Sequence, residues 1–196
     1  MGDIKSAREI AEEKLARLGE ATEEERLKWK YGPEGERLGG RYIKEDVNLV
    51  AELQQYQGEV RKHIVKGAGD ILIRNINLPK DNLAKRNNRR SMDGLKILKS
   101  DKVAVENVYS KIRRIINHYE QEGEQQRRQA YQALKADFEA KVQQAVAQQL
   151  GPVTGFKVDV EKQPQFQEEW RRVQAQLDAQ YIKLLDEYKQ ELRAIT

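Results

Sequence analysis

The sequence contains no cysteine, and this absence excludes several kinds of site at once. Disulfide bonds, cysteine-ligated zinc and thiol nucleophiles all require a sulfur atom that the chain does not supply. The sequence also lacks any run of about 18 apolar residues, so no transmembrane helix is expected. We therefore predict a cytoplasmic protein that has no membrane partner.

Prolines and apolar residues are scarce as well. The 196 residues include only four prolines, and 38% of them are hydrophobic while 35% are charged. Ala, Glu, Lys, Gln, Leu and Arg, which all favour helix, dominate the composition. Few apolar residues combined with many helix formers indicate a thin core and a large surface, as in long helices packed side by side. We predict an all-α fold in the form of an elongated helical bundle.

The clearest periodicity lies near the C-terminal end of the sequence. Apolar residues recur there at intervals of three and four, and the pattern repeats every eleven residues. Eleven residues in three turns give about 3.67 residues per turn, so the stripe runs almost straight along a helix. Pro164 stands where the first turn of such a helix tolerates proline. The stripe consists of Phe166, Trp170, Val173, Leu177, Tyr181, Leu184, Tyr188, Leu192 and Ile195.

Two further apolar stripes, over residues 105–119 and 131–145, precede this one. Residues 120–129, between them, contain no apolar side chain. Two arrangements are open for this part of the chain: one unbroken helix from about 101 to 149, or two helices that meet in a bend at Gly123. One glycine costs about 1 kcal/mol relative to alanine and its neighbours all favour helix, so we predict the unbroken helix.

The long helix and the C-terminal stripe together predict a hairpin over residues 100–196. Two matched apolar stripes joined by a modest loop pack in opposite directions. We therefore expect a long antiparallel helical hairpin with coiled-coil-like contacts and an eleven-residue repeat.

Residues 1–99 are predicted to form an N-terminal helical region. Helices are expected over about 4–18 and 47–66, from the spacing of their apolar residues. Thr22 and Glu25 have the spacing of a capping box, which indicates that another helix begins there.

Two glycine clusters interrupt this region. The first gives a Gly-rich loop near residues 32–40, and the second, residues 66–70, is interpreted as a turn or helix break. Neither completes a dinucleotide fingerprint or ends in the Gly-Lys-Ser/Thr of a phosphate loop. Residues 71–79 form the densest apolar run of the chain and are expected to be buried.

The sequence offers no constellation of catalytic or metal-ligating residues. Its two histidines, His63 and His118, lack a second histidine or an aspartate three or four residues further on. Each flanks an apolar stripe, so we interpret both as half-covered boundary residues. Adjacent glutamates such as Glu168 and Glu169 point about 100° apart on a helix and do not converge on a substrate. We expect no catalytic, cofactor-binding or metal site, and no enzyme activity.

The remaining candidate is a basic segment over residues 74–99, which carries a net charge of +6. If it is helical, Arg86 and Arg90 share one face. That face could contact phosphates or an acidic protein, or it could be a solvated face that the acidic first forty residues neutralise. The candidate contact surface comprises Lys80, Lys85, Arg86, Arg89, Arg90, Lys96 and Lys99.

These features predict a non-enzymatic helical interaction or scaffold protein that acts through helix packing and the basic segment. The alternative is an RNA- or DNA-binding accessory protein that uses residues 80–99, although these lack the aromatic residues that single-strand binding usually needs. A protein partner is expected first and nucleic acid second. Self-association is compatible with the unpaired length of the apolar stripes.

Overall fold

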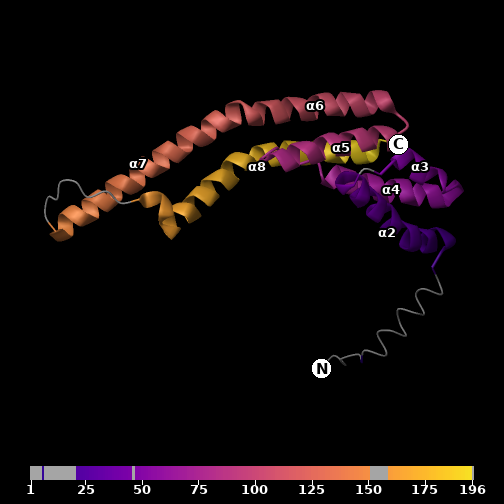
Figure 1. Cartoon of the computed structure of the whole chain (residues 1–196), viewed down its shortest axis with the longest axis horizontal. Coiled ribbons are helices and arrows are strands. Elements are labelled where there is room, and N and C mark those ends of the chain that lie inside the picture. The colour runs from indigo at the N-terminus through magenta and orange to yellow at the C-terminus, as the bar shows by residue number, and fades with distance from the viewer. Residues whose placement is uncertain (1–5, 7–20, 46, 151–158, 196) are drawn as a thin grey trace. The chain divides into compact units, whose positions relative to one another are not determined.

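The computed structural model describes residue 6 and residues 21–45, 47–150 and 159–195. Every regular element in these ranges is a helix (Figure 1), so the all-α prediction is confirmed. The helix expected over residues 4–18 lies outside the described residues, apart from Ser6. The elements are α2 (Glu23–Lys44), α3 (Leu49–Gln54), α4 (Gly58–Arg74), α5 (Asn82–Leu98), α6 (Lys102–Glu120), α7 (Glu122–Leu150), the 3-10 turn η1 (Val160–Lys162) and α8 (Pro164–Ala194).

The chain divides into two compact units. The first contains Met1–Ile76, Arg86–Val105 and Arg193–Thr196, and the second contains Asn77–Lys85 and Glu106–Leu192. Helices α2, α3 and α4 thus lie in the first unit and α7 in the second, whereas α5, α6 and α8 contribute residues to both.

Helix α2 begins at a capping box. The Glu25 N–H donates to the Thr22 hydroxyl at 3.2 Å, and the Thr22 N–H donates to the Glu25 carboxylate at 2.9 Å. These bonds satisfy N–H groups that a helix start leaves without intrahelical partners, and they hold the pKa of Glu25 below its ordinary value. The capping box predicted from the spacing of the two residues is confirmed.

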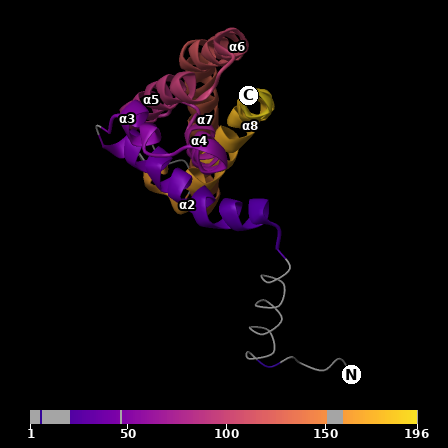
Figure 2. The same cartoon turned by 90° about the vertical axis from the view of Figure 1, so that its right-hand side faces the viewer.

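The loop predicted near residues 32–40 is wrong. Helix α2 passes through the whole segment, and Pro33 lies inside it. Glycine and proline disfavour a helix interior by about 1 and 3 kcal/mol relative to alanine, so tertiary contacts have to offset this cost. Helices α2 and α4 lie against each other (Figure 2), and two of the glycines, Gly35 and Gly39, are buried one turn apart on the side of α2 that meets α4.

Helices α2 and α4 approach each other closely at glycines. A Cβ on Gly35 would overlap the carbonyl group of Ile64, and a Cβ on Gly67 of α4 would overlap the carbonyl oxygen of Gly32. Side chains do not come so close to a neighbouring backbone, so only glycine admits this separation. Residues 66–70, interpreted from the sequence as a turn or helix break, are instead a packing surface inside α4.

The helix predicted over residues 47–66 is divided in the structure. Helix α3 ends at Gln54, and α4 begins at Gly58, whose φ of 55° lies in the left-handed region that glycine adopts readily. Helix α4 then continues to Arg74, beyond the predicted end. The run over residues 71–79 is buried as predicted, at Leu72, Ile73, Ile76 and Leu78.

Arg90 of α5 satisfies the backbone at the end of α2. Its Nε and Nη2 atoms donate to the carbonyl oxygen of Tyr42 at 2.9 and 2.6 Å, and Nη2 also donates to that of Glu45 at 2.6 Å. The last carbonyl groups of a helix have no intrahelical partner, so they need donors of this kind. One residue of the predicted contact surface therefore stabilises the first unit.

In the second unit, α6 and α7 follow each other with an interruption at Gln121 (Figure 1). The N–H of Gln121 still donates to the Asn117 carbonyl at 3.0 Å, while the helix changes direction. The unbroken helix predicted over residues 101–149 is therefore wrong, and the interruption lies two residues before Gly123. Residues 120–129 have no apolar stripe that could hold the helix straight against a neighbour.

Helix α8 packs along α6 and α7 through aromatic rings. The ring centroids of Tyr119 and Tyr181 are 5.2 Å apart, and those of Tyr131 and Trp170 are 5.1 Å apart. Both pairs meet edge to face, which is a favoured geometry for aromatic rings. The later residue of α6 and α7, Tyr131, thus contacts the earlier residue of α8, Trp170. Within the second unit α8 therefore runs antiparallel to α6 and α7.

The buried side of α8 differs in part from the predicted stripe. Phe166 and Leu192 are buried as predicted, and Pro164 begins the helix. Leu184, however, is 42% exposed, whereas its neighbour Leu185 is only 2% exposed. Consecutive residues of a helix lie about 100° apart, so the contact side is rotated by one position in this part of α8.

Replacing Gly35 with alanine is expected to destabilise the first unit. The added Cβ forces α2 away from α4, and overpacking of this kind costs about 1–3 kcal/mol. Gly40→Ala is the matched control, because no atom lies within 4 Å of its Cβ position and alanine improves helix propensity by about 1 kcal/mol. Urea unfolding followed by circular dichroism should show Gly40→Ala as the most stable protein and Gly35→Ala as the least. Equal stability of the two variants would contradict the close contact.

Arg90→Gln is expected to lower the free energy of unfolding by about 1–3 kcal/mol, because the carbonyl oxygens of Tyr42 and Glu45 lose their donor. Arg89→Gln removes the same charge from an exposed neighbouring position and should change stability by about 0.5 kcal/mol at most. The same unfolding titration compares them. If both variants lose stability equally, net charge rather than these hydrogen bonds is responsible.

Candidate functional site

The predicted basic segment is centred on α5. Asp81 caps the start of this helix, since its carboxylate accepts a hydrogen bond from the Ala84 N–H at 2.7 Å. One side of the helix is buried, at Asn88, Ser91, Met92, Gly94 and Leu95. The cations of α5 consequently divide between positions near the protein interior and positions on the opposite, solvent-facing side.

Two predicted contact residues are ion-paired within the second unit. The Lys80 Nζ atom lies 2.6 Å from the carboxylate of Asp178, and the Lys85 Nζ atom lies 2.8 Å from that of Glu120. These counter-ions belong to α8 and α6, whereas the sequence suggested the first forty residues as the source of neutralising acids. The positive charge at the start of the segment is thus balanced inside the fold.

Two other predicted contact residues serve the first unit. Arg90 donates to the carbonyl groups at the end of α2, and Lys99 donates to the carbonyl oxygen of Ile195. Burial lowers the pKa of Lys99 below its ordinary value, and the charge of Asp70 opposes this shift. Both cations are therefore occupied by contacts that hold the chain together.

The remaining three, Arg86, Arg89 and Lys96, lie on the exposed side of α5. They share this side with one acid, Asp93, and with Ile97, which is 40% exposed. Arg86 and Arg89 form no hydrogen bond or ion pair with any residue that the structure describes. We name these five residues the α5 outer face.

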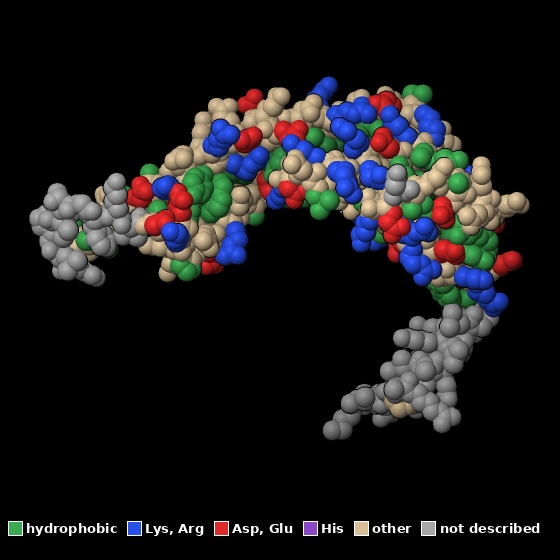
Figure 3. All heavy atoms as spheres, viewed as in Figure 1, with side chains coloured by type: hydrophobic (Ala, Val, Ile, Leu, Met, Phe, Trp, Pro, Cys, Tyr) green, Lys and Arg blue, Asp and Glu red, His purple; other side chains and the backbone are tan. Residues whose placement is uncertain are grey.

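The described basic side chains are interspersed with others on the one face of the molecule that Figure 3 shows. On the face drawn in Figure 3, lysines and arginines alternate with acidic and apolar side chains. Binding to a nucleic-acid backbone needs a row of cations that contact successive phosphates. Acidic side chains between the cations repel the phosphates and weaken such binding.

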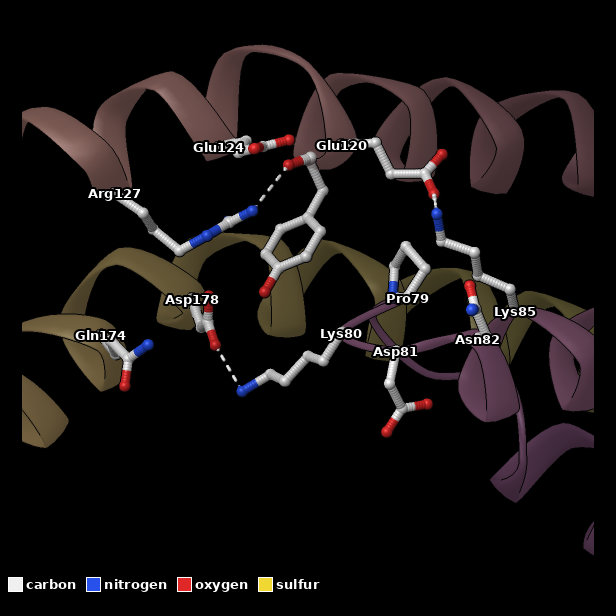
Figure 4. A pocket seen from close by; sticks show the side chains of 11 residues that line it. Pro79, Lys80, Asp81, Asn82, Lys85, Glu120, Glu124, Arg127, Gln174 and Asp178 are labelled. Carbon is white, nitrogen blue, oxygen red and sulfur yellow. Dashed lines mark hydrogen bonds and ion pairs between the residues drawn. The ribbon is translucent and has the colours of Figure 1, made fainter.

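A pocket of about 530 Å³ lies within the second unit (Figure 4). It is formed where the residues that precede and begin α5 meet α6, α7 and α8. We name it the Asp178 pocket, and its lining residues are Pro79, Lys80, Asp81, Asn82, Lys85, Tyr119, Glu120, Glu124, Arg127, Gln174 and Asp178.

Asp178 is the most unusual residue of this pocket. The residue is only 3% exposed, although it is an acid in the middle of a helix. Its Oδ2 atom pairs with the Lys80 ammonium, whereas its Oδ1 atom is buried and has no hydrogen-bond partner among the described residues. The Lys80 side chain is itself 61% exposed. A buried carboxylate is thus compensated by a cation that reaches in from solvent.

Tyr119 and Arg127 form the adjoining wall. Burial raises the pKa of Tyr119 to about 12, and the negative charge of Asp178 is the second largest cause of this shift. The Arg127 guanidinium lies 4.1 Å from the centroid of the Tyr119 ring and donates to the Tyr119 carbonyl oxygen at 3.3 Å. The phenol therefore stays neutral at physiological pH and supplies a hydroxyl group and a ring face rather than a charge.

The structure places the histidines away from any ligand cluster. His118 Nδ1 lies 2.9 Å from the Tyr181 hydroxyl, and His63 is half-buried. Among the described residues, no group of three histidine, aspartate or glutamate side chains is arranged to hold a metal ion. None of the helices in the same ranges combines the length and the apolarity needed to cross a bilayer.

Sequence reasoning missed Asp178. The residue follows Leu177, a member of the predicted stripe, and an acid beside an apolar position reads as the edge of a solvated face. One signal could have drawn attention to it. Asp178 lies seven residues before Leu185, so both share a side of the helix, but this becomes informative only once Leu185 is known to be buried.

Comparison with known proteins places the chain in a family. The comparison with curated proteins gave no match, and neither did the comparison with solved structures. A family model matches residues 50–194, a range that includes the α5 outer face and the whole Asp178 pocket. The chain therefore belongs to the family described as "Family of unknown function (DUF6657)".

Proposed function

We propose that the chain is a non-enzymatic helical interaction protein that binds an acidic segment of a partner protein through the α5 outer face. The observation that carries this proposal is the combination of three exposed cations with an exposed Ile97 on one side of one helix. A helix whose buried side is anchored in the protein offers its other side as a rigid surface.

The division of the basic residues favours a protein partner over nucleic acid. Lys80, Lys85, Arg90 and Lys99 are held by partners within the chain, so few of the seven cations remain for phosphates. Protein–protein interfaces combine a few charged contacts with apolar ones. Binding to a phosphate backbone instead depends on many cations and gains nothing from an exposed isoleucine. The RNA- or DNA-binding reading thus becomes the alternative outcome of the test.

The charge of the α5 outer face defines the chemistry of the partner. Arg86, Arg89 and Lys96 are spaced by three and seven residues and so lie along one line of the helix. A partner helix with glutamates at similar spacing can face them, and an apolar residue beside the glutamates can cover Ile97. Arginine provides most of this surface, and its planar fork suits paired hydrogen bonds to carboxylates.

A scaffold role is consistent with the packing of the second unit. We propose that the long helices form an elongated bundle with an antiparallel, coiled-coil-like hairpin and an eleven-residue repeat. The edge-to-face aromatic contacts of α8 with α6 and α7 support this arrangement. Such a hairpin separates binding surfaces along its length and needs no catalytic group. The proposed location is the cytoplasm, and self-association through the hairpin is compatible with it.

The test uses a fluorescent synthetic peptide that forms an amphipathic helix with a glutamate stripe and adjacent leucines. We expect the unaltered 196-residue chain to bind it, and the triple variant Arg86→Gln, Arg89→Gln, Lys96→Gln to bind about tenfold more weakly. The matched control is Arg61→Gln, Lys62→Gln, Lys66→Gln, which removes the same charge from exposed positions of α4 and should change affinity by about twofold at most. Fluorescence anisotropy measures both. Equal losses in the two triple variants, or no binding of the peptide, would contradict the proposal.

A second variant separates a protein partner from nucleic acid. Ile97→Ser removes the exposed apolar contact and leaves every cation in place. We expect it to weaken peptide binding about threefold to tenfold while leaving the binding of a short DNA duplex or a single-stranded RNA unchanged. If the chain binds either nucleic acid more tightly than the peptide, and loses that binding in the Arg86, Arg89 and Lys96 variant, the RNA- or DNA-binding function is correct instead.

A further inference from the structure

The carboxylate of Asp178 needs a cation. An ionised carboxylate that is removed from water is strongly disfavoured unless a counter-ion or several donors compensate it. Its Oδ2 atom has the Lys80 ammonium at 2.6 Å, and its Oδ1 atom has no partner within the described part of the chain. The Oδ1 atom is enclosed by protein, so the acceptor that a ligand can reach is Oδ2, which the Lys80 ammonium now covers.

The present counter-ion is replaceable. Lys80 precedes α5 in a segment without helix, and its side chain is 61% exposed while that of Asp178 is 4% exposed. A lysine that reaches a buried acid from solvent through a largely exposed, flexible four-carbon stem can swing away at a modest cost. Figure 4 shows the Lys80 side chain extending toward Asp178, with a dashed line that marks their ion pair.

The rest of the lining favours a cation over an anion. When Lys80 is withdrawn, the lining retains four carboxylates, those of Asp81, Glu120, Glu124 and Asp178, and two cations, Lys85 and Arg127. Glu120 is paired with Lys85, and Glu124 lies 2.5 Å from the exposed Arg128. Asp178 then keeps the neutral Tyr119 hydroxyl as a hydrogen-bond partner and has lost its counter-ion. An anion placed there would face this carboxylate at close range.

The polar groups of the pocket match a primary ammonium. Such a group has three N–H donors and no acceptor. The Oδ2 atom of Asp178 can accept one of them in place of Lys80, and the side-chain amide of Gln174, four residues earlier on α8, lines the same pocket (Figure 4). A volume of about 530 Å³ is in the range of pockets that hold small organic molecules.

We propose that the Asp178 pocket binds the primary ammonium group of a small organic amine, which replaces Lys80 at the Asp178 carboxylate. In this arrangement Lys80 occupies the site when the amine is absent and moves into solvent when the amine binds. The site lies within the second unit and does not involve the α5 outer face, so it stands independently of the proposed function.

The probe is n-butylamine, titrated into the 196-residue chain at constant ionic strength and followed by two-dimensional NMR. Saturable shifts with a dissociation constant below about 10 mM are expected for the Lys80→Gln variant, in which the competing ammonium is gone. The wild type should bind about fivefold more weakly, because the amine must displace Lys80. Asp178→Asn should abolish saturable binding. Asp186→Asn, which removes an exposed acid from the same helix, should leave affinity unchanged.

Two control ligands, tetramethylammonium and inorganic phosphate, test whether binding needs N–H donors and a positive charge. Tetramethylammonium carries the same charge without an N–H donor and should bind at least about tenfold more weakly than n-butylamine. Inorganic phosphate should not bind. The proposal is overturned if Lys80→Gln weakens or fails to improve n-butylamine binding, if phosphate binds in its place, or if Asp186→Asn reduces binding as much as Asp178→Asn. Circular dichroism of each variant establishes that it is folded, and Lys80→Gln decides the question if Asp178→Asn is not.

Discussion

The scarcity of apolar residues is the constraint on which the rest of the structure depends. With 38% hydrophobic residues, the chain has few side chains to spare for apolar packing between its helices. It uses two other means. In the first unit, α2 and α4 meet at glycines, where close approach of the backbones increases van der Waals contact without large side chains. In both units, charged side chains are drawn into the packing, as Arg90 and Asp178 illustrate.

This use of charge explains why the basic segment is not a uniform binding surface. In the unliganded chain, the residues that begin and end it contact Asp178, Glu120 and backbone carbonyl groups. On the side of α5 that points away from the buried Met92 and Leu95, Arg86 and Arg89 are exposed and have no partner among the described residues. A net charge of +6 over residues 74–99 therefore overstates the charge that is available for binding.

The sequence predicted those features that depend on local rules. The helical class, the capping box at Thr22, the start of α8 at Pro164 and the burial of residues 71–79 follow from propensity, capping and hydrophobicity. It failed where a tertiary contact reverses a local preference. Gly35 and Gly39 read as a loop because their partner in α4 is distant in sequence, and Leu184 was expected inside because a repeat alone cannot fix the rotation of a helix.

The candidate site shows the same limit. The cations of the basic segment were recognisable from composition, but their division into inner and outer sets depends on which side of α5 is buried. Asp178 gave no sequence signal of its own, because burial of an acid results from the three-dimensional surroundings and not from its neighbours in the chain. Buried acids of this kind are found only when the packing of the helices is known.

The central claim is that the basic residues fall into a set that holds the fold together and a set that is available for binding. The most direct test compares the free energy of unfolding of two triple variants of equal charge. One is Lys80→Gln, Lys85→Gln, Arg90→Gln, and the other is Arg86→Gln, Arg89→Gln, Lys96→Gln. The account predicts a loss of at least about 3 kcal/mol for the first, because a buried carboxylate and two carbonyl groups lose their partners, and a change within about 1 kcal/mol for the second. Equal losses in the two variants would contradict it.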